Sequence, residues 1–163
     1  PESSLKAYGL SELSGGTLYN SQIVIAPDGM IVARHRKQFL FEPMDFPNGF
    51  TAGRLSEENN PVVMIDGVRL GLMICHDGNS VWLRQHFSEK EVDVILGSFA
   101  SFDPPYPFMR TGSWMVYSNR IGTEGSASYS GQCFIADPLG NKVSVAAPSS
   151  GSYAWYTIHA ERK

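Results

Sequence analysis

The sequence predicts an α/β fold that is rich in β-strands, and three observations lead to this prediction. Short runs of β-branched and aromatic residues recur from Ser21 onward, separated by turn-forming residues. A single convincing helix pattern lies between two of these runs, which predicts a β-α-β unit. A length of 163 residues suits one domain with its own hydrophobic core. We therefore expect one domain over residues 1–163.

The first four predicted strands form two hairpins. Pro27-Asp28-Gly29 separates two β-prone runs, and Asp66-Gly67, a favoured two-residue turn, separates another two. Further strands are expected downstream, and the aromatic alternation near the C-terminus predicts a last one. The expected strands cover residues 21–26, 30–34, 61–65, 68–75, 92–99, 113–119, 131–137, 142–147 and 152–159.

The predicted helix runs from about Ser80 to Lys90. Ser80 is a plausible N-cap, and Trp82, Leu83 and Phe87 recur near helical spacing. One helix leaves much of a large sheet uncovered, so we expect a partner or a further segment to cover it.

Composition and charge exclude several classes of protein. The net charge of −3 argues against a nucleic-acid or acidic-membrane partner, because basic residues do not outnumber acidic ones. No apolar run reaches the roughly 20 residues of a membrane helix, and no secretory signal is visible, so a cytoplasmic location is expected. The first residue is Pro1 rather than Met, which suggests a longer parent chain.

Cys75 is the first candidate functional residue. It ends a predicted strand where the turn into the helix begins, the position at which open α/β sheets place functional groups. Backbone N–H groups there favour a thiolate and could bind an oxyanion. A small buried hydrophobe is the alternative, and it is the expected role of Cys133. His76 should point away from the Cys75 sulfur, and Asp77 should cap the turn.

The basic segment 34–37 is the second signal. A solvated basic surface is its usual explanation, although Lys37 in a desolvated pocket could stabilise an oxyanion. The acidic and thiol groups near Cys75 are too crowded for a metal site, and the sequence predicts no metal and no cofactor.

These segments resemble the nitrilase, or carbon-nitrogen hydrolase, superfamily. The stretch "YNSQIVIAPDGMIVARHRKQFLF" resembles its hairpin and lysine motif, and "VRLGLMICHD" its nucleophile strand. The "DGN" that follows is similar to the aliphatic amidase and formamidase branch. Later strands match in order, so the resemblance covers nearly the whole chain from Tyr19.

The resemblance implies an αββα sandwich, here incomplete and strand-rich, with Cys75 as the nucleophile for a small amide or nitrile. Lys37 and the backbone N–H of His76 are then expected to hold the oxyanion, and a glutamate to act as general base. Glu42 and Asp45 are the candidates for the family's supporting acid. The resemblance also implies an oligomer, or association with a missing part of the same parent chain.

The sequence departs from the family at two places. The family's general-base glutamate lies far upstream of the lysine, and no strand pattern supports Glu2 or Glu12 in that role. There is also little room for the family's helix between Phe99 and Ser113. The chain is therefore expected to lack the N-terminal part and one internal helix.

Two other functions stay open at this point. The chain could be a non-catalytic scaffold or regulatory subunit, or a thiol-dependent acyltransferase. The loop 101–108, "SFDPPYPF", is the expected place for substrate contacts. Aromatic candidates for a pocket wall are Trp82, Phe102, Tyr106, Phe108 and Trp114.

Overall fold

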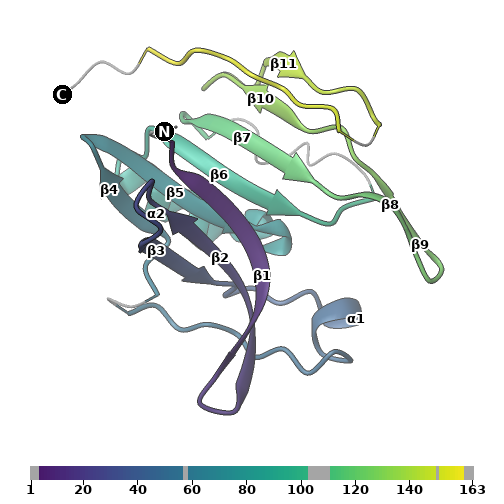
Figure 1. Cartoon of the computed structure of the whole chain (residues 1–163). Coiled ribbons are helices and arrows are strands. Elements are labelled where there is room, and N and C mark those ends of the chain that lie inside the picture. Colours follow the sequence, from purple (N-terminus) through teal and green to yellow (C-terminus); the bar gives the residue numbers. More distant parts are fainter. Residues whose placement is uncertain (1–3, 57–58, 103–110, 150, 160–163) are drawn as a thin grey trace.

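A computed structural model describes residues 4–56, 59–102, 111–149 and 151–159 of the chain (Figure 1). Its strands form a three-stranded sheet, a six-stranded sheet and a two-stranded ribbon. The loop 101–108, where we expected substrate contacts, lies outside the described residues from position 103 onward. The strand-rich α/β class predicted from the sequence is confirmed.

The three-stranded sheet consists of β1 (Lys6–Ser14), β2 (Thr17–Ile25) and β3 (Ile31–Arg36) in antiparallel order. The Pro27-Asp28-Gly29 turn joins β2 to β3 as predicted, and the Asp28 carboxylate accepts a hydrogen bond from the Met30 N–H at 2.9 Å. β1 is a strand that the sequence analysis missed. Its residues are mostly exposed, so it lacks the buried apolar alternation on which the prediction relied.

The six-stranded sheet has the order β11-β10-β7-β6-β5-β4. β5 (Val68–Ile74), β6 (Val94–Phe99) and β7 (Trp114–Asn119) are parallel, while the outer strands pair antiparallel. The outer strands are β4 (Val62–Ile65), β10 (Phe134–Ala136) and β11 (Lys142–Val145). The parallel centre brings the carboxyl ends of β5, β6 and β7 to one edge of the sheet.

The predicted helix is α2 (Val81–Glu89), which connects β5 to β6. The Ser80 hydroxyl accepts a hydrogen bond from the Leu83 N–H at 3.2 Å, so the predicted N-cap is confirmed. Leu83 and Phe87 are fully buried, and they pack on the sheet with Met73, Ile95 and other apolar residues. Burial of this apolar stripe holds α2 on the sheet.

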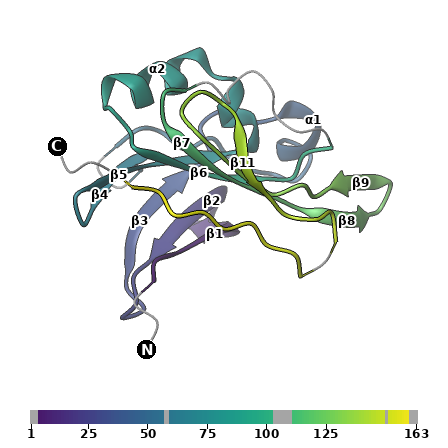
Figure 2. The same cartoon turned by 90° about the horizontal axis from the view of Figure 1, so that it is seen from above.

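The two sheets lie face to face, with α2 on the far side of the larger one (Figure 2). Gln22 of β2 joins them: its Oε1 accepts the Met73 N–H at 3.1 Å, and its Nε2 donates to the Leu96 carbonyl at 3.1 Å and the Ser98 hydroxyl at 3.0 Å. Both the nitrogen and the oxygen of the buried Gln22 amide are therefore hydrogen-bonded to the larger sheet.

The C-terminal segment differs from the prediction. Residues 152–159 form no strand, although Tyr156 contacts Trp114 with ring centroids 5.4 Å apart. A hairpin of β8 (Ile121–Glu124) and β9 (Ala127–Ser130) was also not predicted. Within the described part of the chain, no helix is long and apolar enough to cross a membrane.

Candidate active site

Cys75 follows the last residue of β5 and opens a 3₁₀ helix, Cys75–Asn79. Its φ of 44° lies in the left-handed region, which costs a non-glycine residue about 1–2 kcal/mol. A sharp strand-to-helix turn of this kind presents a nucleophile at the end of a sheet. The cysteine is a free thiol, partly buried, and packs against the core cluster beneath α2.

Lys37 comes directly after β3, and its backbone is held on both sides. Its N–H donates to the Asn20 carbonyl at 2.8 Å, and its carbonyl accepts the Gly53 N–H at 2.8 Å. The side chain is 3% exposed, and its Nζ donates to Asp45 Oδ2 at 2.6 Å. The solvated-surface explanation of this segment is therefore wrong for Lys37.

The two candidate supporting acids share a four-residue helix, α1 (Glu42–Asp45), but have different surroundings. Asp45 is buried, and its Oδ2 accepts both the Lys37 ammonium and the Phe41 N–H, each at 2.6 Å. Glu42 is exposed. Of the two, Asp45 is the residue that the structure brings to Lys37.

Asp77 connects the cysteine turn to the lysine segment. Its fully buried carboxylate accepts hydrogen bonds from the Gln38 and Phe39 N–H groups, at 3.0 and 2.9 Å, and from the Ile74 N–H at 3.2 Å. His35 Nε2 lies 2.8 Å from the same carboxylate. Only the bond from the Ile74 N–H matches the predicted capping role. The other three contacts join the cysteine turn to residues about 40 positions earlier in the chain.

His76 is partly buried and does not belong to the core cluster. Its Nδ1 lies 3.1 Å from Asn79 Nδ2, and its ring centroid lies 5.4 Å from that of Phe41. Trp82, one of the predicted pocket aromatics, is half exposed and stacks on His86. Aromatic side chains thus contact His76 in the cysteine turn and His86 in the helix that follows it.

The other predicted aromatics lie elsewhere. Phe102 is half exposed and stacks on Tyr129, and Trp114 contacts Tyr156, as described above. Tyr106 and Phe108 lie outside the described residues.

Tyr117 is a neighbour of both cysteines that sequence reasoning did not single out. Burial raises the pKa of its phenol well above the ordinary value, and the nearby Cys75 and Cys133 thiols act in the same direction. Cys133 itself contacts the backbone of Asn119 through its sulfur, at 3.3 Å from the N–H. That contact agrees with the structural role expected for Cys133.

Glu12 lies on β1, in a segment where we expected no strand. Its carboxylate binds Arg36 through Nε at 3.0 Å and through Nη2 at 2.6 Å, and it accepts the Ser21 hydroxyl at 2.6 Å. These hydrogen bonds, that from Arg36 above all, lower its pKa to about 2. So weak a base is poorly suited to general-base catalysis near neutral pH.

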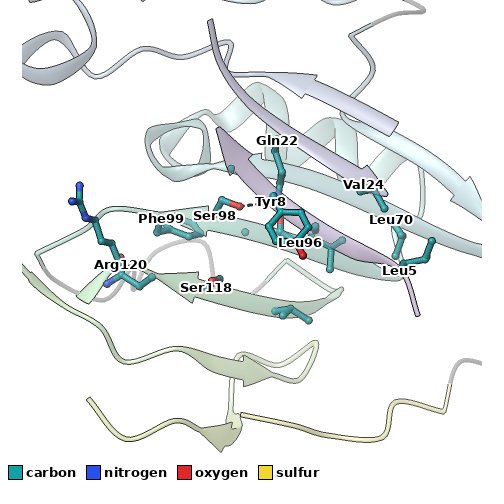
Figure 3. Close-up of a pocket in the computed structure, with 15 residues that line it drawn as sticks. Leu5, Tyr8, Gln22, Val24, Leu70, Leu96, Ser98, Phe99, Ser118 and Arg120 are labelled. Carbon is teal, nitrogen blue, oxygen red and sulfur yellow. Dashed lines mark hydrogen bonds between the residues drawn. The ribbon is translucent and has the colours of Figure 1, made fainter. Parts of the chain in front are cut away.

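A cavity of about 670 Å³ lies between the two sheets (Figure 3). Tyr8, Gln22, Ser98, Ser118 and Arg120 are among its lining residues, and they come from β1, β2 and the ends of β6 and β7. Neither Cys75 nor Lys37 lines it. Among the described residues, no group of three or more His, Cys, Asp and Glu is placed to hold a metal ion.

Residues 4–161 match the carbon-nitrogen hydrolase family, and the chain belongs to this family, which is part of the nitrilase superfamily. It is 30% identical over 150 residues to a hydrolase encoded in the pqqF 5′ region of Pseudomonas protegens, covering 85% of this chain and 51% of that protein. It is 27% identical over 144 residues to an (R)-stereoselective amidase of a Pseudomonas species, covering 81% and 49%.

Solved structures share the fold. An amidase from Nesterenkonia sp. AN1, with acrylamide added to its active-site cysteine, superimposes with a TM-score of 0.82 at 17% identity over 96% of this chain and 64% of its own. The nitrilase-type fold predicted from the sequence is therefore confirmed. The chain spans about half the length of the curated relatives that it matches.

Proposed function

We propose that the protein hydrolyses the C–N bond of a small amide or nitrile through a covalent intermediate on Cys75. The observation that carries the proposal is the convergence of two sequence motifs, because Asp77 binds the lysine segment to the cysteine turn. Membership of the carbon-nitrogen hydrolase family and the amidases among its relatives support it.

In the proposed reaction, the Cys75 thiolate attacks the amide carbon and forms a tetrahedral oxyanion. The Lys37 ammonium and the His76 backbone N–H stabilise this charge. A general base takes the thiol proton of Cys75 and passes it to the leaving ammonia as the thioester forms, and it then takes a proton from the water that releases the carboxylate. The buried Asp45 fixes the direction of the Lys37 side chain through a hydrogen bond of 2.6 Å to Nζ.

A general base is still needed for this cycle. The carboxylates of Asp45, Asp77 and Glu12 already accept strong hydrogen bonds from other groups of the protein. We propose that the base is a carboxylate outside the described residues, supplied by another part of the parent chain or by a second copy in an oligomer.

We further propose that the substrates are short aliphatic amides and that the protein is cytoplasmic. The Asp77-Gly78-Asn79 sequence after the nucleophile favours short aliphatic amides, as in the aliphatic amidase and formamidase branch. A cytoplasmic location is supported by the two free thiols.

Ammonia release by the intact protein tests the reaction directly. Formamide, acetamide, propionamide and the matching nitriles are suitable substrates, with Cys75→Ala and Cys133→Ala as a matched pair of variants. We expect Cys75→Ala to lose activity by orders of magnitude and Cys133→Ala to keep it. Equal activity in wild type and Cys75→Ala would refute the proposal.

A non-catalytic scaffold is the second candidate, favoured by the engagement of Asp45, Asp77 and Glu12. Mild iodoacetamide treatment followed by peptide mass spectrometry separates the two. A catalytic protein should be alkylated at Cys75 well before Cys133. Equally slow labelling of both cysteines would favour the scaffold.

Added hydroxylamine would reveal an acyltransferase by forming a hydroxamate in place of the carboxylate.

A further inference from the structure

We infer that Asp77 is the positioning residue that sets the geometry between the nucleophile and the oxyanion-binding lysine, an inference that rests on the proposed function. The side chain is fully buried two residues after Cys75. Three of its four hydrogen-bond partners, His35, Gln38 and Phe39, flank Lys37 on both sides.

Each carboxylate oxygen of Asp77 has two partners. Oδ1 accepts the Gln38 and Phe39 N–H groups, and Oδ2 accepts the Ile74 N–H and contacts His35 Nε2. An ionised carboxylate offers about four acceptor positions. Because these are filled, Asp77 is unsuited to taking a proton from a substrate. It acts through the segments that it joins.

The donor set explains why this position requires an acid. Four donors converge on the group, and asparagine would place an NH₂ among them while offering a single acceptor oxygen. His35 supports the same arrangement from the end of β3. Its ring is fully buried, and its Nδ1 has no hydrogen-bond partner among the described residues, so Nε2 donating to Asp77 is its one polar contact there.

Consequently, the relative placement of Cys75 and Lys37 depends on the Asp77 side chain as well as on the packing of the two sheets. The Ile74 bond fixes Asp77 to the end of β5, and the Gln38 and Phe39 bonds fix the chain directly after Lys37. Loss of these bonds frees the lysine segment to shift relative to the cysteine turn.

The test compares two reactions of Cys75 in the intact protein. Acylation by p-nitrophenyl acetate forms a C–S bond, breaks the ester C–O bond, and releases p-nitrophenolate and the thiol proton through an oxyanion. Alkylation by iodoacetamide forms a C–S bond and expels iodide without an oxyanion. The ratio of the two rate constants therefore reports the oxyanion geometry and cancels changes in the exposure of the thiol.

We expect Asp77→Asn to lower this ratio on the order of tenfold to hundredfold, because a shift of about 1 Å has effects of that size. In amide hydrolysis, kcat should fall while KM changes little. The matched control is Asp137→Asn, which removes an aspartate that also accepts backbone N–H groups, from Leu139 and Asn141, in the turn between β10 and β11. Its ratio should equal that of wild type.

A second pair of variants covers the case in which Asp77→Asn does not fold. His35→Gln keeps an N–H donor near the position of Nε2 and should preserve the ratio, whereas His35→Leu removes it and should lower the ratio. An unchanged ratio in both Asp77→Asn and His35→Leu, whatever their melting temperatures, overturns the inference. A wild-type protein that shows no Cys75-dependent acylation overturns the proposed function itself.

Discussion

Lys37 Nζ donates a hydrogen bond to Asp45 Oδ2 at 2.6 Å, and the two side chains are 3% and 6% exposed. A buried ion pair of this kind depends on both partners, because removal of one leaves an uncompensated charge away from water. The pair therefore anchors the lysine in one direction. Its acid comes from the loop helix α1 rather than from either sheet.

Substitution of Asp45 should be far more damaging than substitution of Glu42 in the same helix. Asp45→Ala leaves the Lys37 ammonium buried and unpaired, which typically costs about 3–5 kcal/mol. Glu42→Gln changes an exposed side chain and should stay within about 0.5 kcal/mol of wild type. Urea unfolding gives both values. Equal free energies of unfolding would contradict the structural importance of the pair.

Gly53→Ala should disturb the lysine segment through backbone contact. A Cβ at this position would lie 2.5 Å from the Arg36 carbonyl oxygen and 2.6 Å from Arg36 Cβ, so the chain beside Lys37 must move. We expect a loss of about 1–3 kcal/mol, typical of overpacking, together with reduced amide hydrolysis.

Gly9→Ala is the control for this substitution. The added Cβ would meet Ser98 Cβ at 3.5 Å, an ordinary contact distance. We expect the Gly9→Ala variant to have a melting temperature and a rate of ammonia release close to those of wild type. A Gly53→Ala protein with the stability and activity of the Gly9→Ala protein would show that the close approach at Gly53 has no effect.

Glu12 should make the protein less stable in acid. Its pKa is lowered from 4.5 to about 2 in the folded state, chiefly by the hydrogen bond from Arg36. A depressed folded-state pKa adds stability above pH 4.5, and this stability is lost as the pH falls toward 2. Allowing for solvent screening, we expect about 1–2 kcal/mol of acid-sensitive stability from this group.

Urea unfolding at pH 6 and pH 3 measures this contribution. Glu12→Gln should show a smaller loss of stability between the two pH values than wild type does. Glu89→Gln, which removes an exposed carboxylate from α2, is the control for a general change in surface charge. The same pH dependence in Glu12→Gln and wild type would argue against the Arg36 pairing.

Local patterns predicted most of the large sheet and its helix. The Asp66-Gly67 turn, the apolar run of β5 and the Ser80 cap are signals confined to a few neighbouring residues. β1 escaped prediction because an exposed edge strand carries no buried alternation. Residues 152–159 show the reverse error, since an alternating aromatic pattern there forms no strand.

The candidate site was predicted in part. Cys75 and Lys37 were identified from their motifs, and Asp45 was one of two acids that the sequence left undecided. His35 was hidden among basic neighbours, although alternation along β3 places it on the opposite face from Arg34 and Arg36. No local signal indicated that Asp77 would accept hydrogen bonds from residues 38 and 39.

By itself, the sequence indicated Cys75 and Lys37 as candidate functional residues and the strand that each one follows, because strand periodicity, turns and caps act over a few residues. Only the tertiary structure placed Asp45, rather than Glu42, against the Lys37 ammonium, buried Lys37, and made Asp77 the link between two motifs. These outcomes depend on burial and on hydrogen bonds across long sequence separations, which become defined only when the two sheets pack together.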